Sequence, residues 1–321
     1  LLGIMTDFPQ VLIITPYRAE NEGRKKLFLE RTKESVLAQS FRNFHWFVVD
    51  DESPIPAQDA LKNIGDSRVE VFRRKRKPGD ISTASNGINE GLRVLFQDSR
   101  FSDTPYVSAL HSDDMYTKDG IKLKVDAMNK NPEAGFVYTK QQIQNLAGGF
   151  SYIKFVKRGE TDPRRLRKLV WISGFPYMSM LYRKGFIEDV NSQLQYSEKH
   201  EFGIWDPLIR FGEDREMALQ CINAAQDCDW KIISLPYVTA TYTTHDNSIT
   251  GTTDRKSRRT DNERIVRRHY NRFTRNEKAE MIIKDVFCYK RYIRWLPDTI
   301  KTPLKYVRSV IMYHMQKNQF V

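Results

Sequence analysis

The sequence predicts an α/β protein built on a mixed, mostly parallel sheet flanked by helices, with a helical extension at its C-terminal end. Two observations predict this class. Short apolar segments alternate with segments of helical spacing up to about residue 140, which is typical of strand–helix–strand units. Polar residues stand directly after several of the apolar segments, where the ligands of parallel sheets bind.

Each element follows from the spacing of its apolar residues. Short apolar runs predict strands over 11–15, 45–49, 69–72, 106–110 and 136–139. Near-helical spacing predicts helices over 25–39, 83–96 and 118–130. The pattern then loosens, and it predicts strands over 152–156, 178–182 and 237–243 with a helix over 213–225. Basic helical segments follow over 261–272, 277–295 and 303–317.

The chain carries 52 Lys and Arg against 40 Asp and Glu, and its formal net charge is +12. The excess is uneven, because residues 73–77 are all basic and residues 255–268 hold a second concentration of Lys and Arg. Such charge attracts the phosphates of nucleotides, nucleic acids or lipid headgroups, and alone it selects none of them. The run at 73–77 is either a solvated loop or a phosphate contact.

Cysteine content and hydropathy indicate the compartment. Three cysteines at unrelated spacings fit a reducing environment and do not form a zinc-site pattern. No run reaches the roughly 18 apolar residues that cross a bilayer, so we expect a cytoplasmic protein. In the tail, an apolar stripe beside basic residues is typical of core or of a partner interface. The alternative is peripheral contact with the inner face of a membrane through Leu304, Val307, Ile311 and Met315.

The sequence His111-Ser112-Asp113-Asp114 follows a predicted buried strand, where the chain turns toward a helix. Carboxylates at such a turn can hold a divalent cation, and the cation can bridge a diphosphate. Alternatively, Asp113 or Asp114 caps the helix that begins near Thr117. The turn alone leaves both interpretations open.

Gly212-Glu213-Asp214 opens a predicted helix after an aromatic segment. A carboxylate beside aromatic surface suits a general base that faces a sugar hydroxyl. The alternative is an acidic first turn that the helix dipole favours, which is common. A third segment, 242–248, contains His245, which is either a packed imidazole or a metal ligand.

Taken in chain order, these segments resemble the family-2 glycosyltransferases of the GT-A fold, which is Rossmann-like. The segments that carry the resemblance are TPYR and DDES at two strand ends, SDD, GED and the late His245. The TPYR and GED segments are also similar to the β-1,4-galactosyltransferase group. The resemblance covers about residues 11–250. It implies transfer of one sugar, with inversion, from a nucleoside-diphosphate sugar (a UDP-sugar) to a hydroxyl of a glycan or glycoconjugate.

The resemblance also implies roles for the nucleotide-binding residues. Pro16, Tyr17 and Arg18 would line the nucleotide pocket, and Asp51 would contact the base. Asn86, on the helix after the basic run, would touch the nucleotide.

The catalytic end follows from the same resemblance. Asp113 would bind a divalent cation, Mn²⁺ or Mg²⁺, and His245 would be an additional ligand of the metal or the diphosphate. Asp214 would be the general base, with Glu213 turned toward other hydroxyls of the acceptor. The family pattern is Asp-x-Asp, whereas His111 stands here at the first position. An imidazole there can still contact the donor ribose or join the metal shell.

Aromatic residues in the second half are candidates for the acceptor site. Trp171 and Trp205 are predicted to stack against sugar rings, as could Phe175 and Tyr177. Each is equally well explained as an ordinary core aromatic. We accordingly divide the chain into a nucleotide-sugar half, 1–115, an acceptor half, 116–250, and a basic helical extension, 251–321.

Two other function classes fit part of the pattern. A nucleotidyltransferase also binds nucleotide and metal, but it usually carries a glycine-rich phosphate loop where this chain has TPYRAENEG. A basic nucleic-acid-binding protein would explain the charge runs and leave SDD, GED and His245 without a role. We therefore expect a nucleotide-sugar donor and a glycan acceptor as partners, and no nucleic acid.

Overall fold

The computed structural model describes residues 8–76, 83–154, 159–173, 175–194, 204–209, 212–245 and 255–273. The chain forms two compact units, Leu1–Arg267 and Arg268–Val321. All that follows concerns the first. The predicted tail helices at 277–295 and 303–317, with their apolar stripe, lie outside the described residues. The predicted division at residue 115, between a nucleotide-sugar half and an acceptor half, stays a prediction.

The first half of the chain builds the parallel part of the sheet. Four strands pair in parallel in the order β3 (Val69–Arg74), β2 (Phe44–Asp51), β1 (Val11–Tyr17) and β4 (Tyr106–Ala109). Every residue of β1 is buried, as expected for a central strand that is covered on both faces. The carboxyl ends of the four strands therefore meet at one edge, as the sequence predicts.

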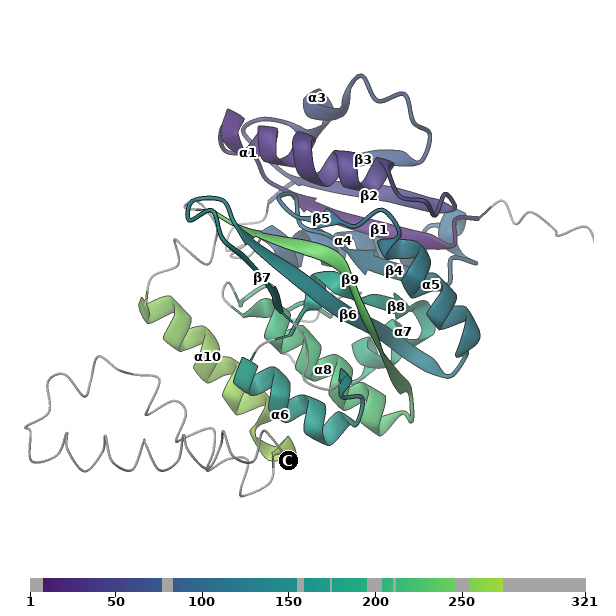
Figure 1. Ribbon diagram of the computed structural model, residues 1–321, viewed down its shortest axis with the longest axis vertical. Helices are drawn as coiled ribbons and strands as arrows, with labels where there is room; N and C mark the ends of the chain where they lie inside the picture. The colour runs from purple at the N-terminus through teal and green to yellow at the C-terminus, as the bar shows by residue number, and fades with distance from the viewer. Residues whose placement is uncertain are drawn as a thin grey trace, which may run out of the picture. The chain divides into compact units, whose positions relative to one another are not determined.

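Helix α4 (Thr83–Gln97) covers one face of this parallel part, behind the sheet in Figure 1. Two glycines allow the close approach. A Cβ on Gly87 would lie 2.8 Å from Cβ of Pro16, and one on Gly91 would lie 2.6 Å from Cγ2 of Ile14. Close backbone approach of helix to strand thus fixes α4 beside the end of β1.

A continuous helical segment covers the other face. It runs through α1 (Glu22–Leu27), a π-helical stretch η1 (Phe28–Lys33) and α2 (Glu34–Leu37). The ring of Phe28 lies 4.7 Å from that of Tyr17 and 5.9 Å from that of Trp46, so η1 packs on β1 and β2. Figure 1 shows α1 in front of these strands.

The second half of the chain continues the sheet as β4–β8–β6–β9–β5, now with both strand directions. β8 (Leu181–Arg183) is antiparallel to β4 and to β6 (Ala134–Asn145), while β9 (Lys231–Thr244) is parallel to β6. β5 (Met115–Tyr116) is antiparallel to β9, and β7 (Ser151–Lys154) is antiparallel to β6. The predicted mixed α/β sheet is confirmed, with its parallel pairings mainly in the first half.

Shorter helical elements complete this unit. The remaining elements are α3 (Ala57–Leu61), η2 (Ser99–Phe101), α5 (Gly120–Lys130), α6 (Pro163–Ser173), η4 (Tyr177–Ser179), α7 (Lys184–Ser192) and α8 (Glu213–Asp227). α10 (Arg255–His269) begins in this unit and ends in the second, to which η5 (Tyr270–Arg272) belongs. α8 is buried along most of its length and packs against α6 and α7. Among the described helices, none combines the length and the apolar character that crossing a bilayer requires.

Candidate active site

The turn that contains His111, Asp113 and Asp114 joins β4 to β5 and is held from two sides. The hydroxyl of Thr32, in the π-helical stretch, donates to the carbonyl of Asp114 at 2.9 Å and to that of His111 at 3.3 Å. The backbone N–H of Thr243 donates to Oδ1 of Asp114 at 2.7 Å. Asp114 therefore joins the turn to β9 and does not cap α5.

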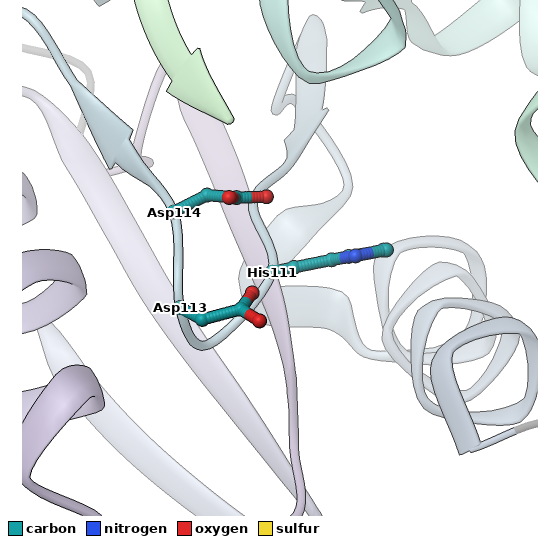
Figure 2. A group of neighbouring side chains, drawn as sticks. All are labelled: His111, Asp113 and Asp114. Carbon is teal, nitrogen blue, oxygen red and sulfur yellow. The ribbon is translucent and has the colours of Figure 1, made fainter. Parts of the chain in front are cut away.

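The three side chains of this turn could hold a cation. One ligand atom from each of His111, Asp113 and Asp114 lies within 4.8 Å of the others, and Figure 2 shows all three leaving the turn toward the same side. Nε2 of His111 and Oδ2 of Asp114 are buried without a hydrogen-bond partner. Carboxylate oxygens and an imidazole nitrogen with spare acceptor capacity fit a divalent cation.

His245 joins this group from the end of β9. Its Nε2 donates to Oδ2 of Asp113 at 3.1 Å, and Asp113 keeps 29% of its side chain exposed. The structure thus brings together the two residues predicted as metal ligands, although they are far apart in sequence.

Burial and neighbouring charges shift the pKa values of the three side chains in the turn. Burial lowers the pKa of His111, against the opposing charges of Asp113 and Asp214, and so favours neutral imidazole. Burial, together with Asp113, raises the pKa of Asp114 well above its ordinary value. Burial acts in the same sense on Asp113, but the hydrogen bond from His245 and the nearby imidazoles leave its pKa lowered. Two carboxylates that repel each other in this way are relieved by a bound cation.

The predicted nucleotide residues meet at the ends of β1 and β2. Nη1 of Arg18 donates to the carbonyl of Asp51 at 3.0 Å. The Asp51 side chain is buried; Oδ1 accepts from Arg74, and Arg76 approaches Oδ2 at 3.4 Å. Oδ2 itself has no hydrogen bond in the described structure. Asp51 therefore retains an acceptor that a ligand can use.

Residues of the basic run at 73–77 form ion pairs within the fold. Arg73 and Arg74 belong to β3, where they pair with the carboxylates of Asp50 and Asp51. Asp50 also accepts from the backbone N–H groups of Ser53 and Ala57, at 2.7 and 2.9 Å. Asp50 thus shapes the loop after β2, and the adjacent Asp51 is the one left for a ligand.

Asn86 lies on α4 beside the end of β1. Its side chain is 4% exposed, and neither its amide oxygen nor its amide nitrogen has a partner. The hydroxyl of Tyr17 is also buried without a partner, and its pKa is raised by burial and by Asp50. A buried polar group without a hydrogen bond lowers stability by about 1–3 kcal/mol. A ligand that pairs with these atoms would remove this cost.

The predicted base lies at the start of α8, where Gly212 adopts a φ of 85° as the N-cap. Asp214 is partly exposed and close enough to raise the pKa of His111 and of Tyr177. It therefore lies near the cation-binding turn. The adjacent Glu213 is 8% exposed, and burial together with Asp214 raises its pKa to about 8. Glu213 is thus protonated at neutral pH.

Aromatic residues connect this helix start to the turn. The hydroxyl of Tyr177 lies 3.2 Å from Nδ1 of His111, and its ring meets that of Trp205 edge-on at 5.8 Å. Trp205 is 2% exposed, and its backbone is held by both amide atoms of Asn89. In this structure Trp205 packs behind Tyr177. Trp171 belongs to α6, and its side chain lies outside the described residues. The acceptor roles of both tryptophans stay predictions.

Residues 13–190 match the family model for glycosyl transferase family 2. The chain belongs to this family. It is similar to the succinoglycan biosynthesis protein ExoW of Rhizobium meliloti, at 31% identity over 121 residues, 38% of this chain and 34% of ExoW. Protein CgeD of Bacillus subtilis is 28% identical over 139 residues, 42% of this chain and 30% of CgeD. The matches thus span about a third of these relatives.

Solved structures agree with this assignment. TarS 1-349 of S. aureus, in complex with UDP-GlcNAc, superposes with a TM-score of 0.61 at 13% identity, over 92% of this chain and 78% of that one. The complex of the same protein with UDP gives 0.53 at 14% identity, over 94% and 87%. The chain therefore has the GT-A fold that the sequence predicts.

Three residues make contacts in this site that were not predicted from sequence. Thr32 fixes the turn from the π-helical stretch, Arg74 holds Asp51 from β3, and Tyr177 bridges His111 and Trp205. Each joins segments that are distant along the chain, and a single sequence contains no signal for such pairings. Tyr177 alone had an indication, as one of several aromatics in the predicted acceptor half.

Proposed function

We propose that this glycosyltransferase moves one sugar from a UDP-sugar to a hydroxyl of a glycan or glycoconjugate, with inversion and with Asp214 as general base. The observation that carries the proposal is the convergence of Asp214 with the turn containing His111 and Asp113. TarS binds UDP and UDP-GlcNAc, and ExoW takes part in succinoglycan biosynthesis, which supports a UDP-sugar donor and a glycan acceptor.

The donor nucleotide would lie across the ends of β1 and β2. Pro16 and Tyr17 would form the wall of its pocket. Oδ2 of Asp51, which has no hydrogen bond in the described structure, would accept one from the base. Asn86 would pair its amide with the nucleotide, and Arg18 would add positive charge near the phosphates. This assignment gives partners to buried atoms that otherwise have none.

His111, Asp113 and Asp114 would hold Mn²⁺ or Mg²⁺, with His245 as an additional ligand of the cation or of the diphosphate. When bound, the cation supplies positive charge that stabilises the diphosphate leaving group. His245 keeps Asp113 ionised through its hydrogen bond, and Thr243 fixes the orientation of Asp114. These residues thus preorganise the charge that the departing UDP needs.

The chemical step requires one displacement. Asp214 takes the proton of the acceptor hydroxyl while that oxygen forms a bond to the anomeric carbon. The bond from this carbon to the diphosphate breaks, and its electron pair leaves with UDP. Because attack and departure occur on opposite faces, the anomeric centre inverts. Glu213, protonated at neutral pH, can donate a hydrogen bond to a neighbouring acceptor oxygen without adding charge.

A donor panel tests the proposal directly. Thermal shift of the full chain would be measured with UDP-, GDP- and dTDP-sugars across a manganese titration. We expect stabilisation by a UDP-sugar that grows with manganese, since a ligand stabilises the fold to which it binds. Equal stabilisation with and without metal would contradict metal assistance, and preference for GDP- or dTDP-sugars would contradict UDP. Retention or inversion would be read from the NMR coupling of the new anomeric proton.

A further inference from the structure

The hairpin formed by β6 and β7 (Figure 1) exposes large apolar side chains. Leu146, Phe150, Tyr152 and Ile153 are 39%, 54%, 55% and 52% exposed. The rings of Phe150 and Tyr152 stack, with centroids 6.5 Å apart and planes 15° from parallel. A cluster of exposed aromatic and aliphatic surface marks a binding region more often than a scattered residue does.

One face of β7 leads from this stack toward the proposed base. Successive side chains on a strand alternate between faces, so Phe150, Tyr152 and Lys154 lie on the same side. The charge of Asp214 raises the pKa of Lys154, against the larger lowering by burial, so these two side chains are near each other. The stacked rings and Lys154, which is near Asp214, therefore share one side of this strand.

Strand pairing gives a second connection between the hairpin and the proposed site. Tyr152 on β7 stands opposite Ile143 on β6, which stands opposite Tyr242 on β9. Tyr242 lies close enough to Tyr177 to raise its pKa. At the tip of the hairpin, the backbone N–H of Leu146 donates to the carbonyl of Thr244 at 2.9 Å, directly before the residue that contacts Asp113. The hairpin thus continues the edge of the sheet at which His245 contacts Asp113.

We propose that Phe150 and Tyr152 form a stacking surface for the sugar rings of an oligosaccharide or longer glycan acceptor, whose reacting end lies at Asp214. The inference rests on the proposed function and adds to it a chain-like acceptor held outside the reacting position. The C–H faces of sugar rings pack on rigid aromatic faces, which bury area at little cost in side-chain entropy.

The composition of the hairpin favours a glycan over a lipid surface. Residues 141–153 contain three Gln and one Asn; the charged residues that flank this segment are Lys140 and Lys154, and Lys154 is near the carboxylate of Asp214. Contact with an anionic membrane typically uses Lys or Arg beside the apolar side chains. Amide side chains instead supply donors and acceptors to sugar hydroxyls.

The test compares glycan binding and donor use in matched variants of the full chain. The protein, saturated with UDP and Mn²⁺, would be applied to an array of oligosaccharides and to phosphatidylglycerol–phosphatidylcholine vesicles. We expect Phe150→Ala and Tyr152→Ala each to weaken binding of the best array glycan by about tenfold, because each removes one stacking face. Tyr237→Ala is the control, since Tyr237 is also exposed, at 52%, and lies on β9 outside the hairpin.

Hydrolysis of the free UDP-sugar and UDP affinity would be measured for every variant, and we expect both to be unchanged. Wild-type binding of UDP without binding to any array glycan would overturn the inference and leave donor use intact. Equal glycan binding by all variants, or loss of vesicle binding alone, would also overturn it. Failure of the wild type to bind or hydrolyse any UDP-sugar would instead contradict the proposed function. Melting curves exclude unfolding as the cause of a loss.

Discussion

Two carboxylate pairs lie at the proposed site, and their surroundings differ. In the turn after β4, Asp113 accepts a hydrogen bond from His245, and the pKa of Asp114 is raised by burial and by Asp113. At the start of α8, the pKa of Glu213 is raised to about 8 by burial and by Asp214. In each pair, burial and the neighbouring carboxylate raise the pKa of one carboxyl group.

The difference lies in what surrounds the other member of each pair. Asp113 lies among imidazoles and carboxylate oxygens, a set that suits a cation and through it a diphosphate. Asp214 lies near Tyr177 and near Lys154, which belongs to β7 of the hairpin. Two Asp residues can thus serve leaving group and nucleophile separately, because environment and not residue type sets the role.

Removing the base is expected to have the largest effect. Asp214→Asn keeps the shape of the side chain and loses its basicity, so kcat should fall by about 10²- to 10⁴-fold. UDP affinity should stay within experimental error, because the change affects the transition state only. Steady-state transfer and UDP titration measure the two quantities. Near-normal turnover in this variant would assign the base to another group.

The cation-binding turn should respond through metal affinity. Asp113→Ala should abolish the manganese dependence of UDP binding, because it removes the most exposed carboxylate of the turn. His245→Ala, which removes the partner of that carboxylate, should raise the manganese concentration at half-maximal activity by about 10- to 100-fold. Measuring activity in a manganese titration at fixed UDP-sugar distinguishes the two variants. If both variants keep the wild-type dependence, the metal site lies elsewhere.

The nucleotide end offers a test in which stability and function oppose each other. Asn86 is buried with an unpaired amide, so Asn86→Ala should raise the free energy of unfolding of the ligand-free protein or leave it unchanged. The same variant should weaken UDP binding by roughly tenfold, since one hydrogen-bonding group is lost. Denaturant unfolding and UDP titration provide both numbers. A variant that is less stable and binds UDP normally would make Asn86 a purely structural residue.

The sequence predicted the donor side of the site better than the acceptor side. β1, β2 and β4 are continuous apolar runs in parallel, so their polar carboxyl-end residues had to meet at one edge. Asp51 and Asp113 therefore could be placed in one crevice without coordinates, whereas Asn86, on a helix, was assigned only by the resemblance. Their partners could not, because Arg74 and Thr32 reach them from neighbouring elements by contacts that periodicity does not encode.

The acceptor side depends on segments with weaker patterns. Most of β6 and β9 carries alternating polar residues, and the sequence predicted about a third of β6 and half of β9. α6 is rich in Arg, and one of its buried positions is Arg167, which donates to Asn223 of α8. Because a charged residue stands at a buried position, the apolar spacing that predicts a helix is incomplete there. α7 was also missed. The exposed hairpin and its stacked rings consequently became visible only in the structure.

The smallest effect on turnover, and the sharpest contrast with Asp214→Asn, is expected from Glu213→Gln. Gln reproduces the neutral form that Glu213 has below its pKa of about 8, so activity at pH 7 should stay within roughly threefold of wild type. Above pH 8 the wild-type carboxyl ionises beside Asp214, and its activity should decline while that of the variant does not. An unchanged alkaline limb would assign the titration to another group.

Stability gives the same assignment an independent check. The pKa of Glu213 is raised from 4.5 in the unfolded chain to about 8 in the folded one, so the folded state holds a proton that the unfolded state has lost between these values. The contribution of Glu213 to stability is therefore complete below pH 4.5 and declines as the pH rises through 8. Glu213→Gln removes this decline, and its advantage over wild type should reach roughly 2–4 kcal/mol above pH 8. Urea unfolding at several pH values measures it. If the two proteins lose stability in parallel from pH 5 to pH 9, Glu213 is ionised in the folded state, and the division of charge between it and Asp214 is wrong.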